Sequence, residues 1–165
     1  MTTEATQKMK LREIVNDSAI VPNLSTSQRD EVIAELLDAL LASGGASADL
    51  RDELIEKVLE RESRGSTGFG RGVAVPHVKH EGVSTIRAAI GLSDRGVDFN
   101  SLDNQPVYSV FLLLSPADKP EEHLQAMEII FKNLSQDTFR RFLRQAESVE
   151  DVLHLLEEAD HQKFA

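Results

Sequence analysis

The sequence has 165 residues, 41% of them hydrophobic, which suits one domain whose core needs no disulfide or metal to hold it together. It contains no cysteine, which excludes disulfides, thiolate metal sites and cysteine nucleophiles. A net charge of −10 and an aromatic content of 5% without tryptophan argue against nucleic-acid binding, which needs basic clusters or stacking platforms.

The sequence shows no feature of a membrane or secreted protein. No apolar run approaches the roughly 20 residues that a membrane-spanning helix needs. The opening segment, MTTEATQKMK, has no apolar stretch of the kind that signal peptides contain. We therefore expect a cytoplasmic protein without membrane insertion. Its expected organisation is a flexible tail over residues 1–10, a single domain over residues 11–160 and a second tail over residues 161–165.

Apolar residues at helical spacing predict two helices before residue 63. The first has its apolar stripe at residues 33–41, with N-caps offered by residues 25–27 and an end at the glycine pair 44–45. The second is capped by Ser47 or Asp49, and its apolar line is Leu50, Leu54 and Val58.

Strands are expected in the middle of the chain, after a glycine-rich loop over residues 63–72. Residues 73–76 predict a short buried strand that ends at its proline. Residues 87–92 predict a second strand. The nearly continuous apolar run VYSVFLLL at residues 107–114 predicts a central strand that is covered on both faces.

Helices return after the strands. Pro120 suits the first turn of a helix, and the predicted apolar face of that helix is Leu124, Met127, Phe131 and Leu134. The next helix is short and holds Phe139, Phe142 and Leu143. The last one, capped by Ser148, runs over residues 149–156. This order of elements predicts an α/β fold in which helices flank a small mixed β-sheet on both sides.

The stretch from residue 63 to residue 80 combines glycines with basic side chains and contains no Asp or Glu, which is unusual in so acidic a chain. Glycine lets backbone N–H groups approach a ligand closely, and arginine offers forked donors to an oxyanion. The combination predicts a phosphate site. Its predicted phosphate-binding residues are Arg64, Ser66, Thr67, Arg71 and Lys79.

His77 follows the short strand and Pro76, which restrains the backbone directly before it. Strand ends are where α/β proteins place their chemistry, and a neutral imidazole, whose ordinary pKa is about 6.5, attacks a phosphoryl group without a separate base. A single histidine after a strand is, however, more often a hydrogen-bonded structural residue. The segment GFGRG matches neither the P-loop nor the dinucleotide fingerprint, which argues against nucleotide binding.

Two segments resemble one known family. RESRGSTGFGRGVAVPHVK is similar to the active-site segment of the fructose/mannitol-type enzyme IIA domains of the bacterial phosphotransferase system, and DFNSLDNQPVYSVFLLLSPADKPEEHLQAM is similar to their second signature segment. The resemblance covers residues 11–158 and is strongest with the stand-alone, nitrogen-related branch. It implies an α/β fold of the phosphotransferase/anion transport protein-like type.

The resemblance also implies roles for three residues. His77 in AVPH falls on the phosphorylated histidine of the family, and His123 in EEHL falls on a second histidine that helps to hold the phosphoryl group. Arg61 in LERES falls on the arginine before the glycine-rich loop. The donor would be a small HPr-like phosphocarrier, itself charged by a phosphoenolpyruvate-dependent enzyme I, so no metal, nucleotide or other cofactor is required.

One residue departs from the family pattern. The family has glycine directly after the active histidine, and this chain has Val78. Because valine resists a positive φ, either the backbone at this position is ordinary or the loop is rebuilt.

An alternative from another functional class is a metal hydrolase that uses His77, His80 and His123. No obvious carboxylate completes such a ligand set. From the residues alone, His123 reads as a capping or surface residue at a helix start. His80 is expected to be exposed in a loop, His154 on the solvent side of the last helix, and His161 in the tail.

Covalent phosphotransfer by His77 and a regulatory role are compatible, since a phosphoryl group changes the charge of a docking surface. The chain ends soon after its last expected helix and has no cysteine to serve as the acceptor of a fused enzyme IIB, which favours regulation. The alternative is a sugar-specific enzyme IIA that passes its phosphate to a separate enzyme IIB for fructose/mannitol-type uptake.

Overall fold

One mixed β-sheet forms the centre of the fold, in the order β1-β5-β6-β3-β2, with β4 also paired to β6. The computed structural model describes residues 9–161. The strands are β1 (Val15–Val21), β2 (Gly68–Gly70), β3 (Val73–Ala74), β4 (His77–His80), β5 (Arg87–Val97) and β6 (Val107–Pro116). All residues of β6 except Tyr108 are buried, as the continuous apolar run predicts for a strand covered on both faces.

The strands β3 and β4 follow one another along the same edge of β6, and both run parallel to it. β3 pairs with residues 109–110 of β6, and β4 pairs with residues 113–116. Val75 and Pro76 lie between the two strands and interrupt the pairing. The interruption places His77 as the first residue of β4, where the chain rejoins the sheet. On the other edge of β6, β5 pairs antiparallel, and β1 pairs parallel to β5.

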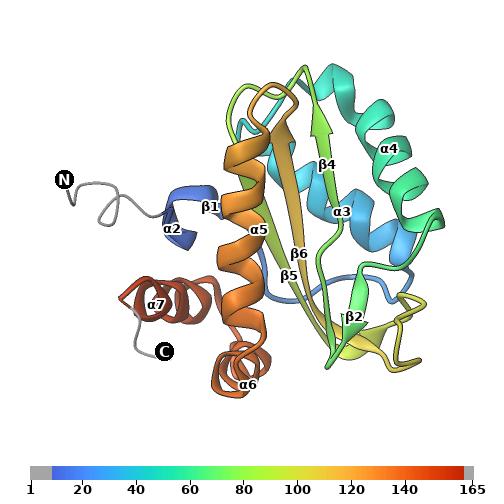
Figure 1. The fold of residues 1–165 in the computed structure, drawn as a ribbon. Coiled ribbons are helices and arrows are strands. Elements are labelled where there is room, and N and C mark those ends of the chain that lie inside the picture. The colour runs from blue at the N-terminus through green and yellow to red at the C-terminus, as the bar shows by residue number, and fades with distance from the viewer. Residues whose placement is uncertain (1–8, 162–165) are drawn as a thin grey trace.

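Helices cover both faces of the sheet (Figure 1). Their bounds are α2 (Leu11–Ile14), α3 (Arg29–Ala42), the short 3-10 helix η1 (Ala48–Leu50), α4 (Arg51–Ser63), α5 (Pro120–Leu134), α6 (Asp137–Gln145) and α7 (Val149–Asp160). The face under α2, α5, α6 and α7 buries side chains that include Ile90, Phe111 and Leu113. The face under α3 and α4 buries their neighbours Ala89, Leu112 and Leu114. This alternation along the strands builds two cores and confirms the predicted α/β fold.

The strand predictions need several corrections: the strand expected at residues 73–76 is only Val73–Ala74, and β4 was not predicted. β1 was not predicted, because its polar centre is exposed and its pairing with β5 shifts between Val15 and Ile20, which hides the alternation of a strand. β2 lies inside the stretch expected to be a loop, where Gly68 pairs with Ala74 of β3. β5 extends beyond the predicted residues 87–92 to Val97, through another shift of register.

The three expectations about helix caps have different outcomes. Residues 25–27 do not cap α3, because the helix begins at Arg29 and its N-cap, Gln28, has no side-chain cap bond. Ser148 does cap α7, and its hydroxyl accepts a hydrogen bond from the backbone N–H of Asp151 at 3.1 Å. Ser47 was expected to cap the second helix but caps the short η1 that precedes it, through the N–H of Asp49 at 3.3 Å, while the N-cap of α4, Leu50, has no side-chain cap bond.

The predicted inner face of α5 is wrong by one residue over most of its length, since Leu124, Met127 and Phe131 each lie one position after a buried residue and only Leu134 is itself buried. Leu124 is 62% exposed, whereas its neighbour His123 is buried. The buried face of α5 is His123, Ala126, Ile130, Asn133 and Leu134. On α6, Phe139 and Leu143 are buried as predicted, but Phe142 is 44% exposed. The face of α5 that packs against the sheet therefore begins with His123 and not with Leu124.

The ends of the described chain are tied to the domain. Lys10 and His161 are the caps of α2 and α7, and the carboxylate of Asp160 accepts the backbone N–H of Leu11 at 2.7 Å. The remainder of both expected tails, residues 1–8 and 162–165, lies outside the described residues. Within residues 9–161, no helix has the length and apolar character needed to cross a membrane.

Candidate functional site

His77 is partly buried at the start of β4, and one of its ring nitrogens is held by the backbone. Its Nδ1 lies 2.9 Å from the carbonyl oxygen of Val75. A carbonyl oxygen only accepts, so Nδ1 bears the hydrogen and donates it. In the neutral ring, Nε2 is then unprotonated and its lone pair is available as a nucleophile. The structure corrects one detail, since His77 opens a strand and does not simply follow one.

His123 lies beside His77 in the first turn of α5. The two ring centroids are 5.5 Å apart, and the ring planes are inclined at 54°. His123 is 7% exposed. Burial in the first place, and the nearby His77 and Lys79 in the second, lower the pKa of His123 to about 4. His123 is therefore neutral at pH 7, and only one of its nitrogens bears a hydrogen.

Ser115 determines which ring nitrogen of His123 bears the hydrogen. Its hydroxyl oxygen lies 2.7 Å from Nδ1 of His123, and its side chain is fully buried. A buried hydroxyl that does not donate loses free energy, so we assign the hydroxyl as donor and Nδ1 as acceptor. The hydrogen of His123 then sits on Nε2, where it can be donated to an anion.

Arg61 lies in the last turn of α4 and is partly buried. Its guanidinium donates to the carbonyl oxygen of Gly65 at 2.9 Å, which ties the helix end to the start of the glycine-rich loop. The neighbouring Arg64 is exposed and pairs with Glu60, one helical turn earlier, at 3.3 Å. The two arginines are thus held by different partners.

The hydroxyls of Ser66 and Thr67 are both engaged within the protein. Ser66 donates to the carbonyl oxygen of Phe99 at 2.8 Å and accepts the N–H of Gly68 at 2.9 Å. Thr67 is buried, and its hydroxyl donates to the carboxylate of Glu62. While these bonds persist, neither hydroxyl is a free donor for a phosphoryl oxygen.

The two remaining predicted phosphate-binding residues are exposed cations. Arg71 has a left-handed backbone with φ of 60°, and its N–H donates to the carboxylate of Asp103 at 3.2 Å. Lys79 lies two residues after His77 on β4, so their side chains leave the same face of the sheet. Its charge contributes to the lowered pKa of His123. Lys79 therefore lies close enough to His123 to affect its pKa, whereas Arg71 lies at the turn between β2 and β3.

Val78 occupies an ordinary extended strand. It pairs with Leu114 of β6, is 6% exposed and belongs to the core under α3 and α4. Of the two alternatives drawn from the sequence, the ordinary backbone is the one observed. A valine here adds apolar contact to the strand that holds His77, and the strand does not need the conformational freedom of glycine.

His80 is not an exposed loop residue as expected, because it ends β4 and is 7% exposed. Its Nδ1 accepts the N–H of Gly82 at 2.8 Å, so Nε2 bears the hydrogen and donates it to Glu53. This hydrogen bond is the main reason that the pKa of Glu53 lies below its ordinary value. Both ring nitrogens are thus engaged on the α4 side of the sheet, away from a site with His77 and His123. His154 is exposed on α7, as expected.

Among residues 9–161 no group of three or more His, Asp or Glu side chains is arranged to hold a metal ion.

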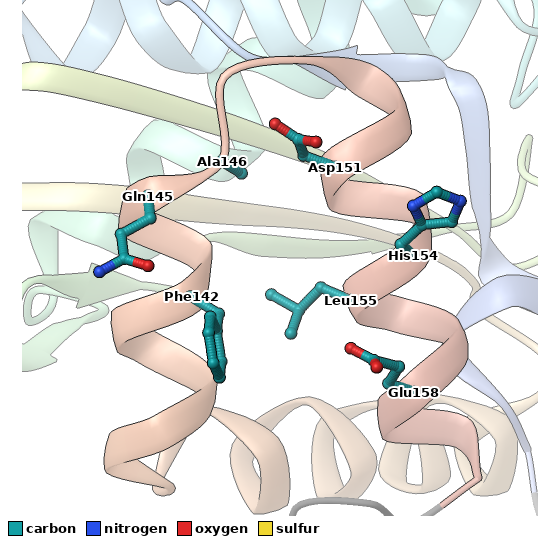
Figure 2. A pocket seen from close by; sticks show the side chains of 7 residues that line it. All are labelled: Phe142, Gln145, Ala146, Asp151, His154, Leu155 and Glu158. Atoms are coloured by element: carbon teal, nitrogen blue, oxygen red, sulfur yellow. The ribbon is translucent and has the colours of Figure 1, made fainter.

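A surface hollow of about 220 Å³ lies between α6 and α7, lined by the seven side chains in Figure 2. Asp151, His154 and Glu158 extend from α7 and Phe142 from α6. None of the site residues predicted from the sequence lines this hollow.

Three groups in the site were missed by sequence reasoning, namely the carbonyl of Val75, the hydroxyl of Ser115 and the carboxylate of Glu62. Val75 acts through its backbone carbonyl, and Ser115 contacts His123 across the loop between β6 and α5, so neither contact leaves a pattern in the sequence. Glu62 is 4% exposed, and its position directly after Arg61 in the matched LERES segment was a signal that could have identified it.

Comparison with known proteins places this geometry in a family. Residues 13–159 match the family model described as the phosphoenolpyruvate-dependent sugar phosphotransferase system, EIIA 2. A nitrogen regulatory protein of Klebsiella oxytoca is 39% identical over 132 residues, 78% of this chain and 76% of that protein. The fructose-specific EIIABC component of Bacillus subtilis is 32% identical over 152 residues, which are 92% of this chain but only 24% of that longer protein.

A solved structure agrees with the sequence comparisons. The crystal structure of the nitrogen regulatory protein IIA-Ntr from Neisseria meningitidis has a TM-score of 0.79 and 31% identity, and the match covers 87% of this chain and 97% of the other. The family model spans nearly all of the described residues and includes both histidines of the site. The chain belongs to the EIIA 2 family of the phosphoenolpyruvate-dependent sugar phosphotransferase system.

Proposed function

We propose that this protein is a cytoplasmic phosphocarrier that accepts a phosphoryl group on Nε2 of His77 from an HPr-like phosphoprotein. The observation that supports this most strongly is the hydrogen bond from Nδ1 of His77 to the carbonyl of Val75, 2.9 Å long. It leaves the outward nitrogen with a lone pair and holds the ring in one orientation. The adjacent ring of His123, whose centroid lies 5.5 Å from that of His77, adds a donor to the same site.

In the proposed transfer, the lone pair of Nε2 attacks the phosphorus atom of the donor's phosphohistidine. A new N–P bond forms as the donor's N–P bond breaks, and the donor's imidazole keeps the electron pair of that bond. His77 retains its hydrogen on Nδ1 throughout, so no separate base is needed. The chemistry depends on in-line positioning and on stabilisation of the three phosphoryl oxygens.

The groups that hold the phosphoryl are His123 and the nearby cations. His123 donates Nε2–H to a phosphoryl oxygen, because the hydroxyl of Ser115 occupies its other nitrogen. Arg61 supplies a guanidinium once it releases the carbonyl of Gly65. Lys79 contributes a positive charge at the rim. Of the other predicted phosphate-binding residues, Arg64 and Arg71 add positive charge to this surface, whereas Ser66 and Thr67 shape the glycine-rich loop, because their hydroxyls already donate to Phe99 and Glu62.

We propose further that the phosphoryl group regulates binding to a protein partner. It adds about two negative charges at a surface that carries Arg64, Arg71 and Lys79. A partner with an acidic contact face binds the unphosphorylated form and is released by the phosphate. The similarity to proteins named nitrogen regulatory protein favours this function. The similarity to a fructose-specific EIIABC component favours a second candidate, transfer of the phosphate to a separate enzyme IIB.

The decisive experiment is phosphorylation in a reconstituted system. Incubation with phosphoenolpyruvate, enzyme I and an HPr-like carrier is expected to raise the mass by about 80 Da, for one phosphoryl group. The variant His77→Ala is expected to stay unmodified, while His154→Ala, which removes an exposed histidine of α7, behaves like the wild type. Phosphorylation of His77→Ala at the wild-type rate would refute the assignment. A purified sugar-specific enzyme IIB that is the sole acceptor of the phosphate would refute the regulatory function.

A further inference from the structure

Glu62 is a buried carboxylate that the proposed transfer does not use. It lies in the last turn of α4 and is 4% exposed. One of its oxygens accepts the backbone N–H of Thr67 at 3.1 Å, and the other accepts the hydroxyl hydrogen of the same residue. Burial of a carboxylate is costly unless donors surround it. These two donors from one residue therefore fix Thr67 against the end of the helix.

Thr67 in turn holds the residue that orients His77. The carbonyl of Thr67 accepts the N–H of Val75 at 3.2 Å, and the carbonyl of Val75 accepts Nδ1–H of His77 at 2.9 Å. Glu62 is thus linked to the imidazole of His77 through two intervening residues, each held by a hydrogen bond. The links join the end of α4, the glycine-rich loop and the gap between β3 and β4.

Val75 needs this support because it lies outside the regular pairing of the sheet. On its C-terminal side, the carbonyl of Pro76 accepts the N–H of Leu113 from β6 at 3.0 Å. On its N-terminal side, the bond to Thr67 belongs to a loop rich in glycine, which loses much conformational entropy when ordered. A buried anchor at Thr67 reduces the freedom of that loop and so fixes the direction of the Val75 carbonyl.

We infer that Glu62 is a positioning residue for His77, which through Thr67 and Val75 holds the imidazole with its hydrogen on Nδ1 and its lone pair on Nε2. The inference rests on the proposed phosphorylation of His77. Glu62 touches neither the phosphoryl group nor the reacting nitrogen. Its loss changes the orientation and the tautomer of the ring while it leaves the nucleophile itself in place.

The test compares four variants with the wild type. Glu62→Gln keeps the shape of the side chain but removes one acceptor, and Glu56→Gln makes the same charge change at an exposed position of α4. Thr67→Val removes the hydroxyl donor, and Thr67→Ser restores it in a side chain of similar size. The Thr67 pair tests the same link without altering any charge, which keeps the inference testable if Glu62→Gln does not fold.

The first readout is the tautomer of His77 in the unphosphorylated protein, measured from the ¹⁵N chemical shifts of its ring. The second is the rate of phosphoryl transfer from the HPr-like carrier. We expect Glu62→Gln and Thr67→Val to populate the Nε2–H tautomer of His77 and to slow transfer about tenfold, equivalent to about 1.4 kcal/mol. Glu56→Gln and Thr67→Ser are expected to match the wild type in both readouts.

An unchanged His77 tautomer and rate in folded Glu62→Gln or folded Thr67→Val would overturn the inference. A loss of rate with an unchanged tautomer would also overturn it, because the residue would then act by another route. The tautomer readout needs no phosphorylation. A wild-type protein that accepts no phosphate therefore refutes the proposed function, while the positioning of His77 by Glu62 is decided separately by the ring shifts.

Discussion

Ser115→Ala tests the assignment of His123 as a neutral donor. The substitution deletes one buried oxygen from β6, and with it the hydrogen bond of 2.7 Å to Nδ1 of His123. The ring then loses the interaction that keeps its hydrogen on Nε2. A hydrogen bond of this kind contributes about 0.5–1.5 kcal/mol. The ratio of the two tautomers of His123 should therefore shift about twofold to twelvefold toward the Nδ1–H form.

Two assays follow the effect of Ser115→Ala. The ¹⁵N shifts of the His123 ring report the tautomer directly. The transfer rate from the HPr-like carrier should fall by no more than the same factor, because it follows the fraction of His123 in the Nε2–H form, which alone donates to the phosphoryl group. Ser109→Ala is the matched control, since it removes another buried serine hydroxyl from the same strand. His123 shifts in Ser115→Ala that equal those of the wild type would show that Ser115 does not select the tautomer, and the assignment of the donor would be refuted.

Three further predictions concern other parts of the site. The pKa of His123 is lowered to about 4, so between that pH and its ordinary pKa of about 6.5 the unfolded chain binds more protons than the native one. The free energy of unfolding should therefore rise with pH across this window by about 2–3 kcal/mol, a contribution that His123→Gln removes, and equal urea-unfolding pH profiles for the two proteins would contradict the burial of a neutral ring. Arg61→Lys keeps the charge but loses the forked donor, which should slow transfer about tenfold, whereas Arg95→Lys, an exposed residue of β5, should not; equal rates would remove Arg61 from the site. Val78→Gly removes a buried side chain from β4 and should lower the free energy of unfolding by about 2–4 kcal/mol in urea titrations while His77 still accepts phosphate; a more stable glycine variant would mean that the family glycine fits this strand better.

Sequence patterns were sufficient to predict a helix or strand where the signal lies within the element itself. The apolar run at β6 predicted a central strand, and Pro120 predicted the start of α5, because both signals are local. The strand β1 was missed because its residues Asn16 and Asp17 are polar and its register is irregular. Strand pairing depends on partners far along the chain, and no local period records that dependence.

The contrast between local signals and contacts made by distant residues also applies to the site. His77 and His123 were found through the resemblance of two segments, and the fold brings their rings together, with the ring centroids 5.5 Å apart. The inward turn of His123 could not be predicted from helical periodicity, because Leu124 beside it is the more apolar residue and yet is exposed. The environment of His80 was mistaken because its partner, Glu53, lies 27 residues earlier on α4. Ionisable side chains of this kind are buried only when a distant partner is brought to them by the fold.

The central claim is that the phosphoryl group resides on Nε2 of His77, and the most direct measurement is NMR of the phosphorylated, ¹⁵N-labelled protein. Coupling between phosphorus and a ring nitrogen identifies the atom that bears the phosphoryl group. Because Nδ1 donates its hydrogen to the carbonyl of Val75, the account predicts phosphorus coupled to Nε2 of His77 and a hydrogen retained on Nδ1. Coupling to Nδ1 of His77, or to any nitrogen of His123, would contradict the account.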